Sequence, residues 1–404
     1  DCNAVGRRCS MKNLETLIQE LCPDGVEFVK LGDVLDYEQP TKYIVKCKDY
    51  QNEGMPVLTA GQTFILGYTD ETNGIYEASR ENPVIIFDDF TTSFHWVDFN
   101  FKVKSSAMKM LRVSSEREVS FRFVYYAMKC IKYQTLEHSR QWISKYSQIE
   151  IPLPPIEVQT EIVRILDKFT SLEAELEAEL DCRKRQYEYY RDKLLSFDNV
   201  GGQEVEWKKM SEVGTFIRGN GLQKKDFTEE GVGCIHYGQL YTHYGTSATE
   251  TITYCSSELA KKLRKAAKGD IVIATTSENV EDVCKAVAWL GEEEIAVSGD
   301  AFIYKHTQNP KYMAYLFQTA SFFNYKKKKA TGTKVIRLTG DAMGNYLAPI
   351  PSLEEQQRIV SILDRFESLT TSLQSGLPAE ISARRQQYEY YRDKLLTFKR
   401  KGVA

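Results

Sequence analysis

Few residues of this 404-residue sequence combine the types and spacing that catalysis requires. An adenine methyltransferase needs a loop of the form Asn/Asp-Pro-Pro-aromatic, but residues 82–84 and 309–312 contain Asn-Pro without the second proline. Residues 219–221 lack the third glycine and the preceding buried strand of a nucleotide-binding turn. Asp88-Asp89 lacks the Glu-x-Lys of a nuclease, and the five histidines are scattered. We therefore predict no catalytic residue, no metal site and no cofactor.

Side chains suited to reading DNA do occur, in clusters on predicted loops. Arg, Lys, Asn and Gln read base edges, whereas Lys, Arg and Ser contact phosphates. An ordinary solvated loop explains any single one of these residues equally well, but the clusters together favour DNA. The predicted DNA contacts are Lys42, Lys46, Lys48, Gln62, Ser139, Arg140, Gln141, Arg218, Asn220, Lys224, Lys225, Gln239, Lys334 and Arg337.

The composition is typical of a cytoplasmic protein with more than one domain. Hydrophobic residues make up 42% and charged residues 27%, and no apolar run is long enough to cross a bilayer. The nine cysteines include no CxxC pair, so neither a zinc site nor a disulfide framework is predicted. Met11 looks like a natural start, so residues 1–10 are expected to be an expression remnant and not a secretory signal.

An internal repeat fixes the architecture that must position the loops. The segment QYEYYRDKLL at residues 186–195 recurs unchanged at residues 387–396. Upstream, IVRILDKF at residues 162–169 matches IVSILDRF at residues 359–366, and both follow a Pro-x-x-Glu-x-Gln pattern. Coincidence does not explain such a match, so the chain contains two copies of one element.

Apolar residues at three-four spacing predict that each copy is a long helix with one packing stripe. From about residue 156 to 197 the first helix is on the order of 60 Å long, which suits a spacer between domains. The two helices are predicted to run antiparallel as a coiled coil. Its seam residues are Leu166, Phe169, Leu176, Tyr187, Tyr190, Leu194, Leu363, Phe366, Leu373, Tyr388, Tyr391 and Leu395.

The second helix differs from the first in register. The upstream blocks lie 197 residues apart and the downstream blocks 201, so the second copy has four extra residues. Gly376 and Pro378 lie in this longer stretch. We therefore predict a break there, with Pro378 in the first turn of the resumed helix, and a straighter first helix.

The segments between the helices predict two α+β domains. Short β-rich runs such as residues 83–87 and 270–274 alternate with turn residues, and Val-Glu-Phe at 26–28 matches Val-Glu-Trp at 205–207. The fold class is α+β: two globular domains separated by two long antiparallel helices in a pseudo-twofold cyclic arrangement. The predicted domains are 11–150 with a short helix at 11–21, then 198–349. The helices are 151–197 and 350–399, and 400–404 is a tail.

The repeated helix ends carry identical charged residues that a packing seam does not need. They indicate a surface that docks the same partner twice, although a recent duplication with unaltered solvated charges explains them more simply. The predicted docking residues are Glu188, Arg191, Asp192, Glu389, Arg392 and Asp393.

From Met11 to about Lys399 the sequence resembles the specificity subunits of type I restriction-modification systems. The resemblance rests on the near-duplicate helices, the Pro-x-x-Glu-x-Gln and IV.ILD blocks, and the VE[FW].K segments. It implies two target-recognition domains that each read half of a split site in double-stranded DNA. It also implies helices that fix the gap and dock two methyltransferase subunits, with restriction subunits joining through the complex. The subunit itself is then non-catalytic.

The charge of the chain departs from what a DNA-binding protein usually carries. The net charge is −3, and neither predicted domain is basic overall. Weak binding by the isolated chain follows if the partner subunits supply most phosphate contacts. Two alternatives remain open: a coiled-coil scaffold whose domains bind proteins, and a stand-alone restriction-methylation enzyme, which the missing methyl-transfer motif disfavours.

Overall fold

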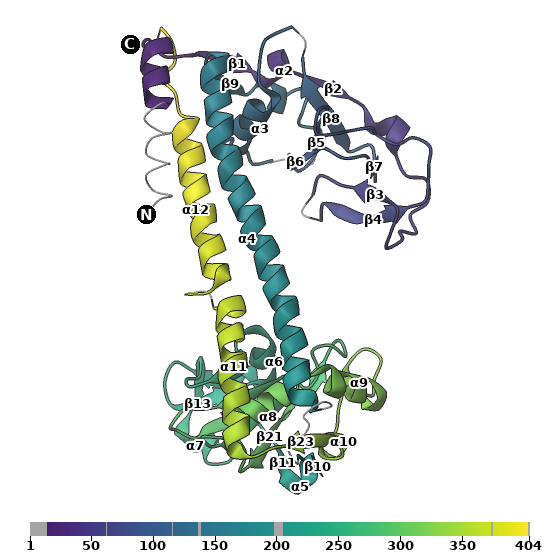
Figure 1. Ribbon diagram of the computed structural model, residues 1–404, viewed down its shortest axis with the longest axis vertical. Helices are drawn as coiled ribbons and strands as arrows, with labels where there is room; N and C mark the ends of the chain where they lie inside the picture. The colour runs from purple at the N-terminus through teal and green to yellow at the C-terminus, as the bar shows by residue number, and fades with distance from the viewer. Residues whose placement is uncertain are drawn as a thin grey trace. The chain divides into compact units, whose positions relative to one another are not determined.

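The computed structural model describes residues 14–61, 63–114, 116–135, 139–197, 205–372 and 375–402 (Figure 1). The chain forms two compact units: residues up to Glu175 join Ile381 onward in the first unit, and Leu176–Glu380 form the second. Residues 14–21 are helical, whereas the predicted expression remnant at residues 1–10 and the predicted start of this helix lie outside the described residues. No helix in the described part of the chain is long and apolar enough to cross a membrane.

The described part of the first unit contains two larger sheets and one two-stranded pair. One is antiparallel, in the order β2-β8-β5-β6, and the other has the order β4-β3-β7 with β3 and β7 parallel. Short helices and turns connect them. The elements are α2 (Leu31–Val34), β2 (Leu35–Glu38), η1 (Pro40–Tyr43), β3 (Met55–Leu58), β4 (Ile65–Thr69), β5 (Val84–Asp88), β6 (Phe94–Val97), β7 (Lys102–Val103), β8 (Met108–Val113), α3 (Phe121–Lys129) and η2 (Tyr146–Gln148).

The second unit contains two five-stranded sheets, in the orders β11-β21-β17-β19-β14 and β12-β15-β13-β20-β16, and the two-stranded pair β18-β22. Its strands are β11 (Gly214–Arg218), β12 (Phe227–Thr228), β13 (Val232–Ile235), β14 (Ser247–Ala248), β15 (Thr253–Cys255), β16 (Lys265–Ala266), β17 (Ile271–Ala274), β18 (Thr276–Ser277), β19 (Ala286–Trp289), β20 (Ile295–Val297), β21 (Ala301–His306) and β22 (Ile336–Arg337). Its short helices are α5 (Met210–Val213), η3 (Lys224–Asp226), α6 (Tyr237–Thr242), α7 (Ser257–Ala260), α8 (Pro310–Leu316), α9 (Ala320–Lys329) and α10 (Gly340–Gly344).

The two units share one plan. The order β2-β8-β5-β6 in the first unit corresponds to β11-β21-β17-β19 in the second, all antiparallel. In the other sheet, β3 pairs antiparallel with one neighbour and parallel with another, as β13 does. The predicted α+β duplication is therefore confirmed.

The central strand of each unit explains the apolar runs in the sequence. Successive side chains of a strand point to opposite faces. In β5, Ile85 and Phe87 join one buried cluster, and Val84 and Ile86 join the cluster on the other face. In β17, the odd-numbered and even-numbered residues divide in the same way between two clusters. Strands covered on both faces need continuous rather than alternating apolar residues.

A two-stranded pair closes each domain where its long helix begins. The strands are β1 (Glu27–Lys30) with β9 (Glu150–Leu153), and β10 (Glu206–Lys209) with β23 (Leu347–Ile350). Phe28 faces Pro152 in the first pair, and Trp207 faces Pro349 in the second. The repeated Val-Glu-Phe/Trp segments therefore form equivalent strands.

The long helices match the predicted difference in register. The first is continuous, α4 (Ile156–Ser196), whereas the second is divided into α11 (Leu353–Thr371) and α12 (Leu377–Leu395). Pro378 lies in the first turn of α12, as predicted. A Cβ atom on Gly376 would lie 2.6 Å from the carbonyl oxygen of Ser368, so the break requires glycine there. Leu373, a predicted seam residue, lies outside the described residues.

Candidate nucleic-acid interface and helix surfaces

Each long helix begins with a buried glutamine that fastens it to its domain. The side-chain amide of Gln159 donates to the carbonyl oxygen of Pro154 at 2.7 Å, and its Oε1 accepts from the Ser120 N–H at 2.9 Å. Ser120 is the N-cap of α3. Gln356 repeats both contacts in the second unit, with Pro351 at 2.9 Å and the N–H of Asn309, the N-cap of α8, at 3.0 Å. The Gln of the Pro-x-x-Glu-x-Gln pattern is therefore a structural anchor.

The aspartate of the IV.ILD block fastens the same domain helix further along. Asp167 Oδ1 accepts from the Tyr126 hydroxyl at 2.5 Å and from Arg122 Nε at 2.8 Å. In the second unit Asp364 accepts from the Tyr315 hydroxyl at 2.7 Å and from Lys311 Nζ at 2.8 Å. Burial and the neighbouring carboxylate together raise the pKa of Tyr126. Sequence reasoning missed these roles, although the constant Gln-to-Asp spacing was a visible signal.

The helix segments pair antiparallel inside each unit through stacked aromatic rings. Phe169 stacks on Tyr391 with ring centroids 5.5 Å apart and an interplanar angle of 22°. In the second unit Tyr190 stacks on Phe366 at 5.7 Å and 24°. Glu173 also accepts from Arg385 Nε at 2.7 Å in the first unit. As the residue number rises on one helix it falls on the other, which gives the antiparallel direction.

The remaining predicted seam residues pack partly against the domains as well as along the helix pair. Leu166 and Leu363 are fully buried, and Leu176 is half-buried. Leu194 is only half-buried, whereas Leu195, which was not predicted, is buried in the domain core. Other packed seam residues are Tyr187, Tyr388 and Leu395, and Leu396 is a further buried residue that the pattern missed.

The predicted docking residues divide into inward and outward groups. The guanidinium of Arg191 lies 5.6 Å from the Tyr187 ring centroid and pairs with Asp192 at 3.1 Å, and its side chain is 12% exposed. Arg392 repeats this arrangement with Tyr388, at 5.7 Å, and with Asp393. Both arginines are thus engaged inside their own units.

The carboxylates of this group also differ in their surroundings. Asp192 accepts from the backbone N–H of Ala320, the first residue of α9, at 3.1 Å. The exposed members of the predicted set are Glu188, Glu389 and Asp393.

The predicted lysine contacts of the first unit lie on one loop between its two sheets. Lys42 lies in η1 with its side chain 78% exposed and its Nζ 3.5 Å from Glu38. Lys46 and Lys48 are exposed. The loop is held because Glu71 accepts from the N–H groups of Lys46 and Cys47, at 2.8 and 3.0 Å. Gln62, another predicted contact, lies outside the described residues.

The predicted loop at residues 139–141 is fixed from beneath by a buried aspartate. Asp89 Oδ1 accepts from the N–H groups of Gln141 and Trp142, at 3.1 and 2.8 Å, and its Oδ2 lies 3.6 Å from Lys109 Nζ. Both charged side chains are 1% exposed. Burial lowers the pKa of Lys109, and the charge of Asp89 opposes this shift.

These contacts also determine which side chains of residues 139–141 are exposed on the surface. Gln141 is 1% exposed, and its amide donates to Ser139 at 2.6 Å. Its side chain therefore lies inside the domain and not on the surface where a DNA contact was predicted. Ser139 is half-buried by the same bond. Arg140 is exposed and forms no ion pair with any described residue.

In the second unit several predicted contacts serve the domain itself. Arg218 donates to the carbonyl oxygen of Gly299 at 2.7 Å, and Asn220 bonds the backbone of Lys262 and Arg264 at 3.1 and 2.7 Å. The backbone turns closely there, because a Cβ atom on Gly219 would lie 2.2 Å from the Ser298 oxygen. This segment is a packed turn rather than an open loop.

Gln239 is likewise a local structural residue. It caps the start of α6, accepting from the His236 N–H at 2.8 Å and donating to Thr253 at 3.1 Å. The predicted contacts of the second unit that remain exposed are Arg218, despite its bond to Gly299, and Lys224, Lys225, Lys334 and Arg337.

One pair of these residues occupies equivalent positions. The backbone N–H of Gln141, the residue after Arg140, donates to the carbonyl oxygen of Asp89 at 2.8 Å, and Asp89 directly follows β5. The backbone N–H of Leu338, the residue after Arg337, donates to the carbonyl oxygen of Thr275 at 3.3 Å, and Thr275 directly follows β17. Arg140 and Arg337 also lie 197 residues apart, the spacing of the upstream helix blocks. The sequence repeat therefore extends upstream to these arginines, which sequence reasoning overlooked.

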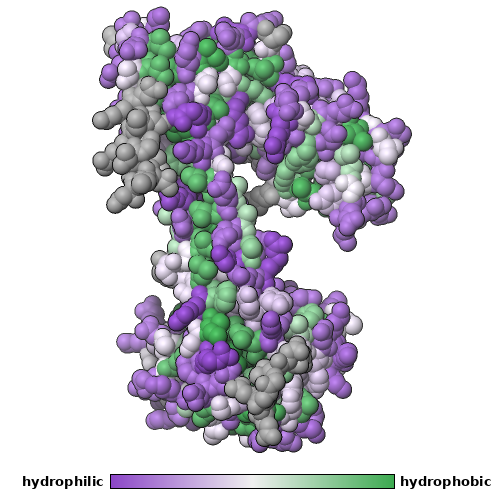
Figure 2. All heavy atoms as spheres, viewed as in Figure 1, coloured by the Kyte–Doolittle hydropathy of each residue, from purple (hydrophilic) through white to green (hydrophobic). Residues whose placement is uncertain are grey.

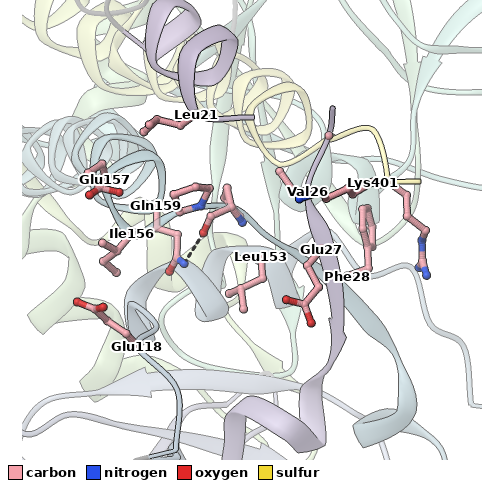
Figure 3. A pocket seen from close by; sticks show the side chains of 14 residues that line it. Leu21, Val26, Glu27, Phe28, Glu118, Leu153, Ile156, Glu157, Gln159 and Lys401 are labelled. Atoms are coloured by element: carbon pink, nitrogen blue, oxygen red, sulfur yellow. Dashed lines mark hydrogen bonds between the residues drawn. The ribbon is translucent and has the colours of Figure 1, made fainter. Parts of the chain in front are cut away.

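A cleft of the first unit at the start of α4 contains none of the predicted DNA contacts. It has a volume of about 910 Å³ and surrounds the start of α4, where the Gln159 anchor is visible (Figure 3). Its other wall includes the chain end, since Val26 and Lys399 to Lys401 exchange backbone hydrogen bonds and Arg400 lies over the Phe28 ring.

The described residues have a mostly hydrophilic surface on one face and no cluster of metal-binding side chains. Hydrophilic residues dominate both units on the face shown in Figure 2. Among the described residues, no group of three or more His, Cys, Asp or Glu side chains could hold a metal ion.

Comparison with known proteins identifies the family. Residues 23–181 and 203–383 match the type I restriction modification DNA specificity domain. The chain is 42% identical to the type I restriction enzyme EcoR124I/EcoR124II specificity subunit of Escherichia coli, with 96% of this chain and 97% of the relative covered. It is 29% identical to the putative type I restriction enzyme specificity subunit S.HindORF215P of Haemophilus influenzae, over 96% of this chain and 100% of that relative.

Solved structures show the same fold. The S subunit of a type I restriction-modification system from M. genitalium matches with a TM-score of 0.52 and 16% identity, covering 92% of this chain and 96% of that one. A chain from a structural study of complex assembly and conformational transition of the type I R-M system matches with a TM-score of 0.54 and 18% identity, covering 94% and 98%. Because the family match spans most of the chain and the Escherichia coli relative aligns almost end to end, the chain belongs to the DNA specificity subunits of type I restriction-modification systems.

Proposed function

We propose that this chain selects the double-stranded DNA sequence on which a type I restriction-modification complex acts. Each domain reads one half of an asymmetric two-part site, and the chain itself catalyses nothing. The observation that carries this proposal is the pair Arg140 and Arg337, which extend from the same position of the same domain plan. Arginine is the residue that most often reads guanine in the major groove.

The proposed DNA-facing set consists of exposed basic side chains. Arg140 lies on a loop and Arg337 ends the short strand β22, each in the segment that leads toward its long helix, and lysines lie on the connection between the two larger sheets of each domain. Those lysines are Lys42, Lys46 and Lys48 in the first unit and Lys224 and Lys225 in the second, with Lys334 on the same loop as Arg337. The buried or bonded residues Gln141, Arg218, Asn220 and Gln239 support this set by shaping the loops.

The helices fit the role of a spacer that fixes the distance between the two half-sites. α4 connects the two domains as one continuous helix of 41 residues. Deleting residues Gln374 to Leu377, which removes the four-residue insertion, is expected to change the gap in the target or to abolish binding. A target with an unaltered gap would refute the spacer role.

We propose that the chain works only in complex with two modification subunits, which carry methyltransferase activity, and with restriction subunits. Its net charge of −3 supports weak intrinsic attraction to phosphate. The isolated chain is therefore expected to bind DNA poorly at physiological salt, and binding is expected to appear when the modification subunit is added.

Mapping of adenine methylation in host DNA, with the gene present and with the gene deleted, tests the proposal. We expect a two-part motif with a constant gap to lose methylation in the deletion strain. An unchanged methylome in a strain that expresses the modification subunit would overturn it.

A protein-binding scaffold is the second candidate, because the acidic charge balance suits protein partners as well. Binding assays with the modification subunit present separate the two. A complex that assembles but shows no preference for any DNA sequence would favour the scaffold.

A further inference from the structure

We propose that α9, a helix without a counterpart in the described part of the first unit, carries a contact site for the phosphate backbone of double-stranded DNA. The site consists of Lys327, Lys328 and Lys329 at the C-terminal end of α9, together with Lys334 on the hairpin that follows. Its contacts do not depend on the base sequence, so it holds the duplex while other residues of the domain read bases. This inference rests on the proposed function, because it names how the DNA of that function is held.

The helix α9 is an insertion relative to the first unit. Ser120 and Asn309 are equivalent, because each is an N-cap that donates its backbone N–H to the buried glutamine of the long helix. Arg140 and Arg337 are equivalent as well. Twenty positions separate Ser120 from Arg140, whereas 28 positions separate Asn309 from Arg337. The second unit therefore has eight extra residues here, and α9 accounts for them, since the described residues of the first unit form no helix between α3 and Arg140.

The charge of this part of the chain is opposite to that of the whole. Residues 301–340 contain eight lysines and arginines and neither aspartate nor glutamate, although the net charge of the chain is −3. Six of the eight basic residues lie between positions 326 and 337. A helix C-terminus favours one or two cations through the helix dipole, but the dipole does not require the charge to continue onto the hairpin. A concentrated basic surface on an acidic chain indicates an anionic partner at that surface.

One lysine of the run is structural and fixes the orientation of the other three. Lys326 is 5% exposed, and its Nζ donates to the carbonyl oxygens of Glu281 and Val283, each at 2.7 Å. Successive residues of a helix are turned by about 100°, so Lys328 lies on the side opposite Lys326 and away from the loop that Lys326 holds. The acidic residues of that loop are Glu278, Glu281 and Asp282. The buried lysine therefore anchors the helix, and the lysines that follow it face solvent.

The exposed lysines continue directly into the segment that carries Arg337. The three lysines of α9 and Lys334 are exposed, and none of them forms an ion pair with a described residue. The hairpin after α9 is closed by Thr331 and Arg337, whose backbone groups exchange hydrogen bonds of 3.0 and 2.8 Å. The C-terminal end of α9 therefore lies beside the backbone of the proposed base-reading arginine. A duplex carries one charge about every 1.7 Å along its axis, so DNA that contacts Arg337 also brings phosphates near these lysines.

The residue type favours phosphates over bases as the ligand. Lysine presents a flexible point charge, whereas the bidentate reading of base edges uses arginine, asparagine or glutamine. The site contains lysines alone, so it supplies attraction without sequence preference. This attraction belongs to the second unit, because the insertion that provides it occurs there.

The test measures DNA binding by the assembled complex of the full-length chain and the modification subunit at several salt concentrations. The α9 variant, Lys327→Gln with Lys328→Gln, removes two charges and keeps good helix-forming residues. The plot of log affinity against log salt concentration should become less steep by about two. Affinity at about 0.1 M salt should fall by about tenfold or more for target and non-target DNA alike, with the preference for the target unchanged. Lys261→Gln with Lys262→Gln is the matched control, since these are adjacent exposed lysines of the same unit outside the site.

The outcomes separate this inference from the proposed function. An unchanged salt dependence and affinity in the α9 variant would overturn the phosphate site and leave the proposed function intact. Weaker binding of the modification subunit, with unaltered DNA affinity of the assembled complex, would also overturn it and would assign the lysines to an acidic protein surface. An equal loss in the control would show a general effect of charge and would count against the site. A wild-type complex that binds all duplexes alike would overturn the proposed function, whereas a loss of affinity in the α9 variant would still support the phosphate site.

Discussion

The two units hold the same loop by different chemistry. In the first unit the loop that carries Arg140 is fixed by the buried carboxylate of Asp89, which also faces Lys109. In the second unit the loop that carries Arg337 is fixed by backbone pairing between β18 and β22 and by the Thr275 carbonyl oxygen. The shared element is the backbone position. This difference teaches that the two domains present the arginine at the same backbone position while the side chains around it differ. Under the proposed function, such differences would let the two domains read different bases.

Removing the carboxylate of Asp89 should produce the largest difference in stability between the two units. Asp89→Ala leaves the Lys109 charge buried without a partner and deprives the Trp142 N–H of its acceptor, whereas the Gln141 N–H keeps the backbone carbonyl oxygen of residue 89. We therefore expect the first unit to lose about 3–5 kcal/mol of stability. Thr275→Val, at the equivalent position, should cost about 1 kcal/mol or less, because the backbone carbonyl bond remains. Urea unfolding of both full-length variants measures the difference. Equal losses of stability in the two variants would contradict the conclusion that a side chain fixes this loop in the first unit only.

The glutamine anchors Gln159 and Gln356 should have equal effects on the two units, because here both units use the same hydrogen bonds. Gln159→Ala and Gln356→Ala each leave one half-buried N–H and one buried carbonyl group without this partner, at an expected loss of about 2–3 kcal/mol. Hydrogen exchange at the first turns of α3 and α8 should rise in the corresponding variant only. Glu354→Ala, an exposed neighbour on α11, is the control and should leave exchange unchanged. A large effect at one anchor and none at the other would show that the anchors are not equivalent.

A smaller effect of pH should distinguish the units. His306 ends β21 opposite Gly214, where the first unit has Val113 opposite Leu35. Burial lowers the pKa of His306 to about 4 from an ordinary value of 6.5. Between these values the unfolded chain takes up a proton that the folded unit refuses, so the second unit should lose stability as the pH falls, by on the order of 2 kcal/mol.

Thermal unfolding of the wild type and of His306→Val at pH 7 and pH 4.5 measures this effect. The substitution should flatten the pH dependence of the second unit and leave that of the first unchanged. A pH dependence that is the same in the variant would assign the effect to other groups.

Much of the architecture could be predicted from the sequence. Apolar residues at helical spacing predict the long helices, and the ten-residue identity shows that the helix occurs twice. The break before Pro378 followed from the four extra residues. The prediction of the seam was less accurate. The three-four pattern predicts Leu194 as a seam residue, but it is Leu195 that the domain core buries. A pattern along one helix does not reveal a second packing surface.

The candidate contacts were harder to predict because the same residue types serve loops and packed turns. Residues 218–220 resemble a DNA-reading loop in composition, yet Arg218 and Asn220 bond the backbone of their own domain. The side chain of Gln141 is buried, and its backbone N–H is held by Asp89, a residue distant in sequence. Conversely, Arg140 and Arg337 matched at the repeat spacing, but their equivalence became evident only from the hydrogen bonds of the residues that follow them.

The central claim, that two equivalent domains read the two halves of one site, is tested most directly by the methylated motif that each arginine variant produces. Host DNA is sequenced for adenine methylation in strains whose complexes carry Arg140→Ala or Arg337→Ala. Each variant should relax or lose recognition in a different half of the two-part motif, with the other half and the gap unchanged, at a cost of about 1–3 kcal/mol in discrimination. Variants that affect the same half, or that leave both halves intact, would contradict the account.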